Sequence, residues 1–273
     1  MPSTTPSSPK PLTILSVGCG NMGEALLKIF LHHQPTPHII AISQKQKNIR
    51  GIIWHSADAP LPTDISPDII LLAIKPQIAD ATLPKYQTFS SALFISIMAG
   101  KPMDDLEKIL GQNKKIIRAM PNLLVKVKKG FTSYCTNQHC HDDDEDRFQK
   151  LFLPSGAIEK ISHQDDYDMM ASLFGCAPGF LLAMAAMIQK TAGNQTNIND
   201  NQLKKIIQNM FIGSMEIADD DKASFSSIAQ QVASRGGMTE AGLKILENQQ
   251  SGFTPLWEKT INAATQQAKE LAK

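Results

Sequence analysis

A glycine-rich loop near the start of the chain has the residue types and spacing that bind the phosphates of a dinucleotide. The pattern G-x-G-x-x-G follows an apolar run at 12–17 and precedes helical spacing at 21–30. In this setting backbone N–H groups at a helix N-terminus can face a pyrophosphate. The loop residues predicted to bind the cofactor are Gly18, Cys19, Gly20, Asn21, Met22 and Gly23. The alternative is a glycine turn that only packs the helix on the strand.

The segment after the second apolar run favours NADPH over NADH. An Asp or Glu after this strand would hold the ribose 2′-hydroxyl of NADH, but the run at 38–42 is followed by S-Q-K-Q-K. Ser43 and Lys45 are therefore predicted to bind the 2′-phosphate of NADPH, with Lys47 adding positive charge and NADH as the weaker alternative. The competing interpretation is that these lysines are only solvated.

Three further loops are predicted to meet the cofactor at one edge of a sheet. The run at 69–74 is apolar at consecutive positions, as a parallel strand buried on both faces should be, and the runs at 93–98 and 115–120 repeat this theme. Ligands of open α/β sheets bind outside the carboxyl ends of such strands. The predicted contacts are Ala73, Ile74, Lys75, Pro76, Ile97, Met98, Ala99 and Asn122. Any one loop could simply end a strand, but all three together favour a binding edge.

A second anion-binding turn is predicted more than two hundred residues later. Gly236 and Gly237 precede a helical run at 239–248, so their backbone N–H groups can approach an anion. The alternative is that the two glycines merely start a packed helix.

Two segments have residue types found in metal sites or redox switches, but their patterns support neither function. His139, Cys140 and His141 precede the acidic run 142–146, but the spacing fits no common zinc site, so no metal is predicted. Acids before a helical pattern favour a helix start near Asp143. Cys19 could be a redox switch, but no neighbouring base lowers its pKa, so it is predicted to be inert.

The elements that must position these residues indicate an α/β fold followed by helices. Strands alternating with helices predict a doubly wound, mainly parallel sheet, and the alternation at 130–136 predicts a further strand at its edge. Helical patterns cover 180–191, 202–218, 223–233 and 239–248. We therefore expect a disordered tail over 1–11, a dinucleotide-binding domain over 12–162 and a helical domain over 163–273.

Composition limits the partners of the protein. The 273 residues carry a formal net charge of +1, which favours neither a nucleic-acid partner nor an anionic membrane surface. Four irregularly spaced cysteines suit a reducing cytoplasm, and the apolar run at 180–188 is too short to span a bilayer.

The helices around 180–191 and 202–218 carry more apolar residues than a small domain can cover, which predicts an obligate homodimer.

The successive motifs resemble those of one enzyme family. G-C-G-N-M-G, A-I-K-P-Q, S-I-M-A-G, R-A-M-P-N and G-G-M-T-E-A-G-L-K-I-L-E are similar to the motifs of pyrroline-5-carboxylate reductase, over about residues 12–270. The resemblance implies a Rossmann domain that binds NAD(P)H and a C-terminal all-helical dimerisation domain, in a homodimer or a dimer-based higher oligomer. It also implies NADPH-dependent reduction of 1-pyrroline-5-carboxylate to L-proline, the last step of proline biosynthesis, with the substrate at the junction of the two domains.

The resemblance assigns the late turn to the imino-acid substrate. Thr239 is the implied catalytic residue, and the implied substrate contacts are Cys176, Gly236, Gly237, Met238 and Thr239. The chain departs from the family at F-G-C-A-P-G-F, residues 174–180, and at Arg235 and Met238. The family also places an acidic residue near the substrate, in the helix before the late turn. This chain has no obvious match for that residue, and only Asp219, Asp220 and Asp221 lie nearby in the sequence. The alternatives are a reductase of another imine or carbonyl compound and an NADP-binding sensor or scaffold without turnover.

Overall fold

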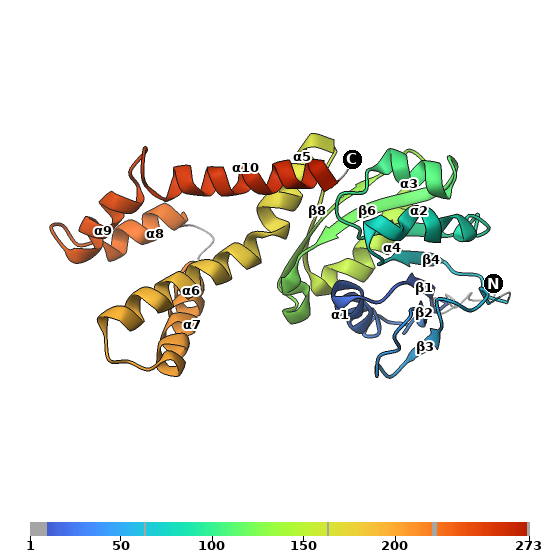
Figure 1. Ribbon diagram of the computed structural model, residues 1–273, viewed down its shortest axis with the longest axis horizontal. Coiled ribbons are helices and arrows are strands. Elements are labelled where there is room, and N and C mark those ends of the chain that lie inside the picture. Colours follow the sequence, from blue (N-terminus) through green and yellow to red (C-terminus); the bar gives the residue numbers. More distant parts are fainter. Residues whose placement is uncertain (1–9, 63, 163, 220–222, 272–273) are drawn as a thin grey trace, which may run out of the picture. The chain divides into compact units, whose positions relative to one another are not determined.

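The computed structural model describes residues 10–62, 64–162, 164–219 and 223–271. The chain divides into two compact units, one comprising residues 1–176 and 265–273 and the other residues 177–264. The labelled elements of both units can be followed along the chain in Figure 1. The predicted domain boundary after residue 162 stays a prediction, and most of the predicted tail lies outside the described residues.

The first unit is built on one eight-stranded sheet with the order β3-β2-β1-β4-β5-β6-β7-β8. The strands are β1 (Thr13–Val17), β2 (His38–Ile42), β3 (Ile52–His55), β4 (Ile69–Leu72), β5 (Leu93–Ser96), β6 (Lys115–Pro121), β7 (Gly130–Thr136) and β8 (Gly156–Lys160). Every neighbouring pair is parallel except β6 and β7. The six strands from β3 to β6 have the order of a dinucleotide-binding Rossmann sheet, which confirms the predicted fold class.

Helices cover both faces of this sheet. The helices are α1 (Asn21–Phe30), α2 (Ala79–Thr82), α3 (Met103–Leu110), α4 (Asp142–Phe152) and α5 (Gln164–Met170), with 3₁₀ turns η1 (Pro76–Ile78), η2 (Leu83–Tyr86), η3 (Leu123–Val127) and η4 (Leu153–Ser155) and a π-helical turn η5 (Ala171–Gly175). One core is shared by the sheet with α1 and α4, and the other by the sheet with η2 and α3. Because successive strand residues point to opposite faces, β1 places Ile14 in the first core and Leu15 in the second. This double burial explains the continuous apolar runs.

The structure corrects the expected end of the sheet. The predicted edge position of residues 130–136 is wrong, because β7 lies between β6 and β8. Neither β8 nor β3 was predicted. The five residues of β8 are G-A-I-E-K, of which three are exposed and only Ile158 has high strand propensity, so they have little strand signal of their own and depend on pairing with β7.

The second unit is helical, as predicted. It contains α6 (Ala177–Gln195), α7 (Asp200–Ile217), α8 (Phe225–Val232), α9 (Met238–Leu246) and the first part of α10 (Phe253–Leu271), a helix that was not predicted. A capping box between Asn199 and Gln202 starts α7, and α6 packs against α7. Within the described ranges, no helix has the length and hydropathy needed to cross a membrane.

Candidate active site

The glycine loop between β1 and α1 passes very close to the end of β4. Gly18 has a φ of +86°, and a Cβ atom at this position would lie 2.6 Å from the carbonyl oxygen of Ala73. A Cβ atom at Gly23 would lie 3.0 Å from the Cβ of Ala73. Both glycines are therefore needed for close packing, and the loop brings two predicted parts of the cofactor site together.

Gly20 leaves open space at the N-terminus of α1. It is the N-cap residue of the helix, with a φ of −69° and no side-chain cap, and a Cβ atom added there would meet nothing within 4 Å. The first N–H groups of a helix have no partner inside it and carry partial positive charge. Asn21 is exposed beside them, whereas Met22 packs partly against the first core. The loop thus has the shape and polarity to accept a phosphate group.

Lys47, unlike Ser43 and Lys45, belongs to an ion-pair network after β2. Glu24 Oε1 accepts a hydrogen bond from Lys28 Nζ at 2.7 Å, and its Oε2 accepts one from Lys47 Nζ at 2.6 Å. The hydrogen bonds from Lys28 and Lys47 lower the pKa of Glu24 to about 2. Lys47 is therefore occupied in this structure. Exposed Lys45 has no ion pair with any described residue and donates its backbone N–H to Ser43 Oγ at 3.4 Å.

The ends of β4 and β5 lie at the edge of the sheet where the glycine loop lies. Ala73 N–H donates to the carbonyl of Val17 in β1 at 2.8 Å, and Ile97 N–H donates to the carbonyl of Leu72 in β4 at 3.1 Å. Ala99 is exposed, but the Met98 side chain is buried in the second core, which leaves only its backbone for a ligand. Ile74 also packs on that core, and Lys75 precedes Pro76, the first residue of η1.

The side chain of Asn122 holds three other parts of the first unit in place. Its Oδ1 accepts hydrogen bonds from the backbone N–H groups of Leu124 at 3.1 Å and Phe131 at 3.2 Å. Its Nδ2 donates to the carbonyl of Phe174 at 3.0 Å, and the Phe131 and Phe174 rings lie 5.0 Å apart. A cofactor contact through Asn122 stays a prediction, but the structure adds a positioning role that the sequence analysis missed. The signal that could have indicated this role is an asparagine directly before a helical turn, since Asn is a preferred N-cap residue.

We expect Asn122→Ala to lower the free energy of unfolding by about 2–3 kcal/mol, because it leaves two backbone donors and one carbonyl without their partner. Denaturant unfolding of the variant and the unchanged protein measures this loss. Asn113→Ala, at an exposed position, is the matched control and should change the free energy by less than about 0.5 kcal/mol. Equal effects of the two substitutions would contradict the positioning role.

In the second unit, the late glycine turn is already hydrogen-bonded within the chain. Gly236 has a φ of +73°, and its N–H donates to Glu240 Oε2 at 2.6 Å. Gly237 is the N-cap residue of α9 and donates its N–H to the carbonyl of Ser234 at 2.9 Å. The hydrogen bond from Gly236 also lowers the pKa of Glu240. The glycine N–H groups expected to meet an anion are thus engaged, because Glu240 reaches back one turn.

The first residues of α9 retain the capacity to bind an anion. Met238 is 94% exposed, and the Thr239 side chain is also exposed. The first N–H groups of a helix lack partners inside it, and no hydrogen bond from the N–H of Met238 or Thr239 occurs among the residues that the structure describes. An anion at this turn would be held by these two N–H groups and the Thr239 hydroxyl, or would displace Glu240. Asp219 follows α7, whereas Asp220 and Asp221 lie outside the described residues.

The buried Cys19 and the acidic segment before α4 have structural rather than chemical roles. None of the four cysteines forms a disulfide; Cys176 is exposed after η5, and Cys19 is buried. Burial raises the pKa of the Cys19 thiol, which favours the inert interpretation. Asp144 Oδ2 accepts a hydrogen bond from the His141 N–H at 3.0 Å in a capping box, so the acidic segment starts α4 as predicted. No group of three metal-ligating side chains occurs in the described part of the chain.

Comparison with known proteins identifies the family. A family model described as pyrroline-5-carboxylate reductase dimerisation matches residues 164–271, and one described as NADP oxidoreductase, coenzyme F420-dependent, matches residues 12–100. The pyrroline-5-carboxylate reductase of Staphylococcus aureus (strain COL) is 26% identical, covering 96% of this chain and 98% of that protein. The crystal structure of the Plasmodium falciparum enzyme with NADP bound has the same fold, with a TM-score of 0.83 at 24% identity, covering 96% of this chain and 98% of that one.

A second relative has a higher sequence identity to this chain. The pyrroline-5-carboxylate reductase of Aquifex aeolicus (strain VF5) is 30% identical over 260 residues, covering 93% of this chain and 96% of that protein. The similarity therefore extends over most of both units rather than over one motif. This protein therefore belongs to the pyrroline-5-carboxylate reductase family.

Proposed function

We propose that this protein reduces 1-pyrroline-5-carboxylate to L-proline with NADPH as the hydride donor. The observation that carries the proposal is the 30% identity to a named pyrroline-5-carboxylate reductase across 93% of the chain. The match of residues 12–100 to an NADP oxidoreductase model supports the choice of cofactor.

The glycine loop fits a dinucleotide. The open space over Gly20 at the start of α1 suits a pyrophosphate, and Gly18 lets the loop lie against Ala73. Ser43 and Lys45 would hold the 2′-phosphate. When bound, the cofactor supplies the hydride that adds to the C=N carbon of the substrate.

The N-terminus of α9 is the proposed position of the substrate carboxylate. The Met238 and Thr239 N–H groups and the Thr239 hydroxyl would neutralise and orient it, with Gly236 and Gly237 shaping the turn and Cys176 as a further proposed contact. Hydride addition to an imine that is already protonated requires orientation and exclusion of water more than a dedicated acid–base pair. This requirement is consistent with a site whose proposed residues include no carboxylate or histidine.

Steady-state oxidation of NADPH with 1-pyrroline-5-carboxylate, run beside a calorimetric titration with NADPH, tests the proposal. We expect turnover to proline together with NADPH binding. NADPH binding without turnover would instead support the sensor or scaffold, and turnover only with another imine or carbonyl compound would replace the substrate.

Cofactor preference gives a second prediction. We expect Lys45→Glu to weaken NADPH binding about tenfold, because it replaces a charge-assisted contact by repulsion of the 2′-phosphate. NADH lacks this phosphate, so its dissociation constant should change by less than about twofold and serves as the internal control. Calorimetry with both cofactors measures the difference, and equal weakening of the two would remove Lys45 from the 2′-phosphate site.

A homodimer is the proposed assembly, with dimer-based higher oligomers as the alternative. The match of residues 164–271 to a dimerisation model supports it, and so does an exposed apolar stripe on α7. Ile206 is 52%, Met210 47% and Ile217 69% exposed in the single chain. Surfaces of this kind mark interfaces. We also propose a cytoplasmic location, which is supported by four cysteines that form no disulfide.

We expect the protein to sediment as a dimer or larger assembly, and Met210→Asp to weaken the association by at least about tenfold, because a buried charge would lack a partner. Gln208→Asp, on an exposed position of the same helix away from the stripe, is the matched control. Analytical ultracentrifugation over a concentration series measures both variants. An unchanged association constant for Met210→Asp would show that the stripe is not the interface.

A further inference from the structure

A groove of about 400 Å³ runs along one side of α1 in the first unit, where the helix faces η3 and the residue after it. Its lining residues are Asn21, Glu24, Ala25, Lys28, Ile29, His32, Lys126 and Lys128. The lining residues within α1 run from Asn21 to Ile29, eight positions apart, so the groove follows the helix for roughly 12 Å at a rise of 1.5 Å per residue and continues past its end to His32. This volume is within the range of small-molecule sites.

The charges in the groove do not cancel. Glu24 accepts hydrogen bonds from both Lys28 and Lys47, so its negative charge is compensated on its own side of the groove. Lys126 and Lys128 form no ion pair with any residue in the described ranges. The groove therefore holds two ammonium groups whose charge is not neutralised by any carboxylate among the described residues.

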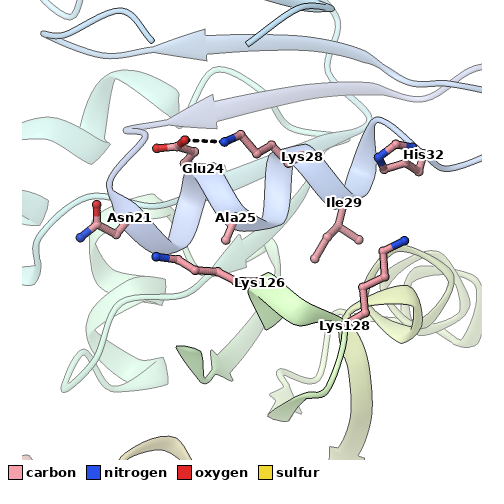
Figure 2. A pocket seen from close by; sticks show the side chains of 8 residues that line it. All are labelled: Asn21, Glu24, Ala25, Lys28, Ile29, His32, Lys126 and Lys128. Atoms are coloured by element: carbon pink, nitrogen blue, oxygen red, sulfur yellow. Dashed lines mark hydrogen bonds and ion pairs between the residues drawn. The ribbon is translucent and has the colours of Figure 1, made fainter. Parts of the chain in front are cut away.

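The two ammonium groups point to different ends of the groove. Figure 2 shows Lys126 reaching toward the Asn21 end of α1 and Lys128 toward the His32 end, with Ala25 and Ile29 between them. Ala25 and Ile29 are each only 7% exposed and form an apolar floor. The groove thus has a positive charge at each end and an apolar middle.

The backbone at one of these lysines is strained. Lys128 has a φ of 58° and is the one non-glycine residue with positive φ in the described part of the chain. It closes η3 in the left-handed conformation, where glycine or asparagine is usual. A side chain kept at such a position at a conformational cost is a reason to look for a function.

We propose that this groove is a binding site for a small elongated dianion, with an anionic group at each end and an apolar chain between them. The site goes beyond the proposed reductase function, since a reductase needs only its cofactor and substrate. Each terminal anion would pair with one lysine, as point charges of this kind do, and the chain would cover Ala25 and Ile29. Asn21 also belongs to the predicted dinucleotide loop, so binding must be measured with that loop occupied.

Calorimetry on the full chain saturated with NADP⁺, at low ionic strength, tests the site with suberate as the probe. We expect suberate to bind more tightly than succinate, which is too short, and than octanoate, which has one charge. Lys126→Gln and Lys128→Gly should each weaken suberate binding about three- to fivefold, in line with exposed ion pairs. High salt should weaken it further.

The controls separate a built site from general surface charge. Lys129→Gln removes a neighbouring exposed lysine that does not line the groove, and it should change suberate binding by less than about twofold. Lys128→Gly relieves the left-handed strain, so the fold should be at least as stable, and Lys128→Asn, which also tolerates that conformation, provides a second test. Absence of suberate binding to the NADP⁺-saturated protein, no preference over octanoate, or equal effects of Lys126→Gln and Lys129→Gln would overturn the proposal.

Discussion

Replacing Gly18 by alanine is expected to lower the free energy of unfolding by about 2–5 kcal/mol and to abolish NADPH binding. Part of the cost is conformational, because the φ of +86° disfavours any side chain by about 1–2 kcal/mol. The rest is steric, because the new Cβ would lie 2.6 Å from the Ala73 carbonyl oxygen and 2.8 Å from Ile74 Cγ2. Denaturant unfolding and calorimetry measure the two losses.

Gly20→Ala is the matched control, because it separates cofactor binding from folding. The backbone of Gly20 has an ordinary φ of −69°, and the added methyl group would meet no protein atom within 4 Å. Stability should therefore change by less than about 0.5 kcal/mol, whereas NADPH binding should weaken at least about tenfold, because the methyl group occupies the space proposed for the pyrophosphate. Unchanged NADPH affinity in a folded Gly20→Ala protein would remove this loop from the cofactor site.

Thr239→Ala is expected to lower kcat/KM for 1-pyrroline-5-carboxylate about ten- to a hundredfold and to leave the dissociation constant of NADPH unchanged. Loss of one hydrogen bond to a charged group costs about 1.5–3 kcal/mol. The Thr239 side chain is exposed at the start of α9, so its loss should not change the melting temperature. Steady-state kinetics, cofactor titration and thermal unfolding of the same preparation provide the three measurements.

Thr254→Ala is the comparison for this result, since Thr254 is also an exposed threonine in the first turn of a helix, α10. It should leave kcat/KM within about twofold of the unchanged protein. A Thr239→Ala protein with lower thermal stability and unaltered kcat/KM would show that Thr239 only starts a packed helix, and would refute its assignment to the substrate carboxylate.

The local parts of the fold and of the candidate cofactor site could be predicted from the chain alone. The pattern around Gly18, Gly20 and Gly23 predicts a strand, a tight turn and a helix, and the structure shows that Gly18 and Gly23 lie too close to Ala73 for a side chain. The runs that became β4, β5 and β6 were identifiable because strands buried on both faces are mostly apolar, although β5 also buries Ser96 and β6 also buries Arg118. The alternation of these strands with helices then predicts a doubly wound sheet, whereas the order of the strands comes from the structure.

Other features depend on partners far away in the sequence. The strand β8 has little strand signal of its own and depends on β7 for its hydrogen bonds, and this pairing moves β7 away from the edge where the alternation of residues 130–136 had placed it. The side chain of Asn122 is engaged by Phe174, which is 52 residues away, and Lys47 by Glu24, which is 23 residues away. A pattern of residue types records what a segment can bury or expose, but not which groups come within hydrogen-bonding distance after folding. For this reason the motifs identified the loops of the site, whereas the folded chain determined which donors, such as the Gly236 N–H held by Glu240, are already occupied.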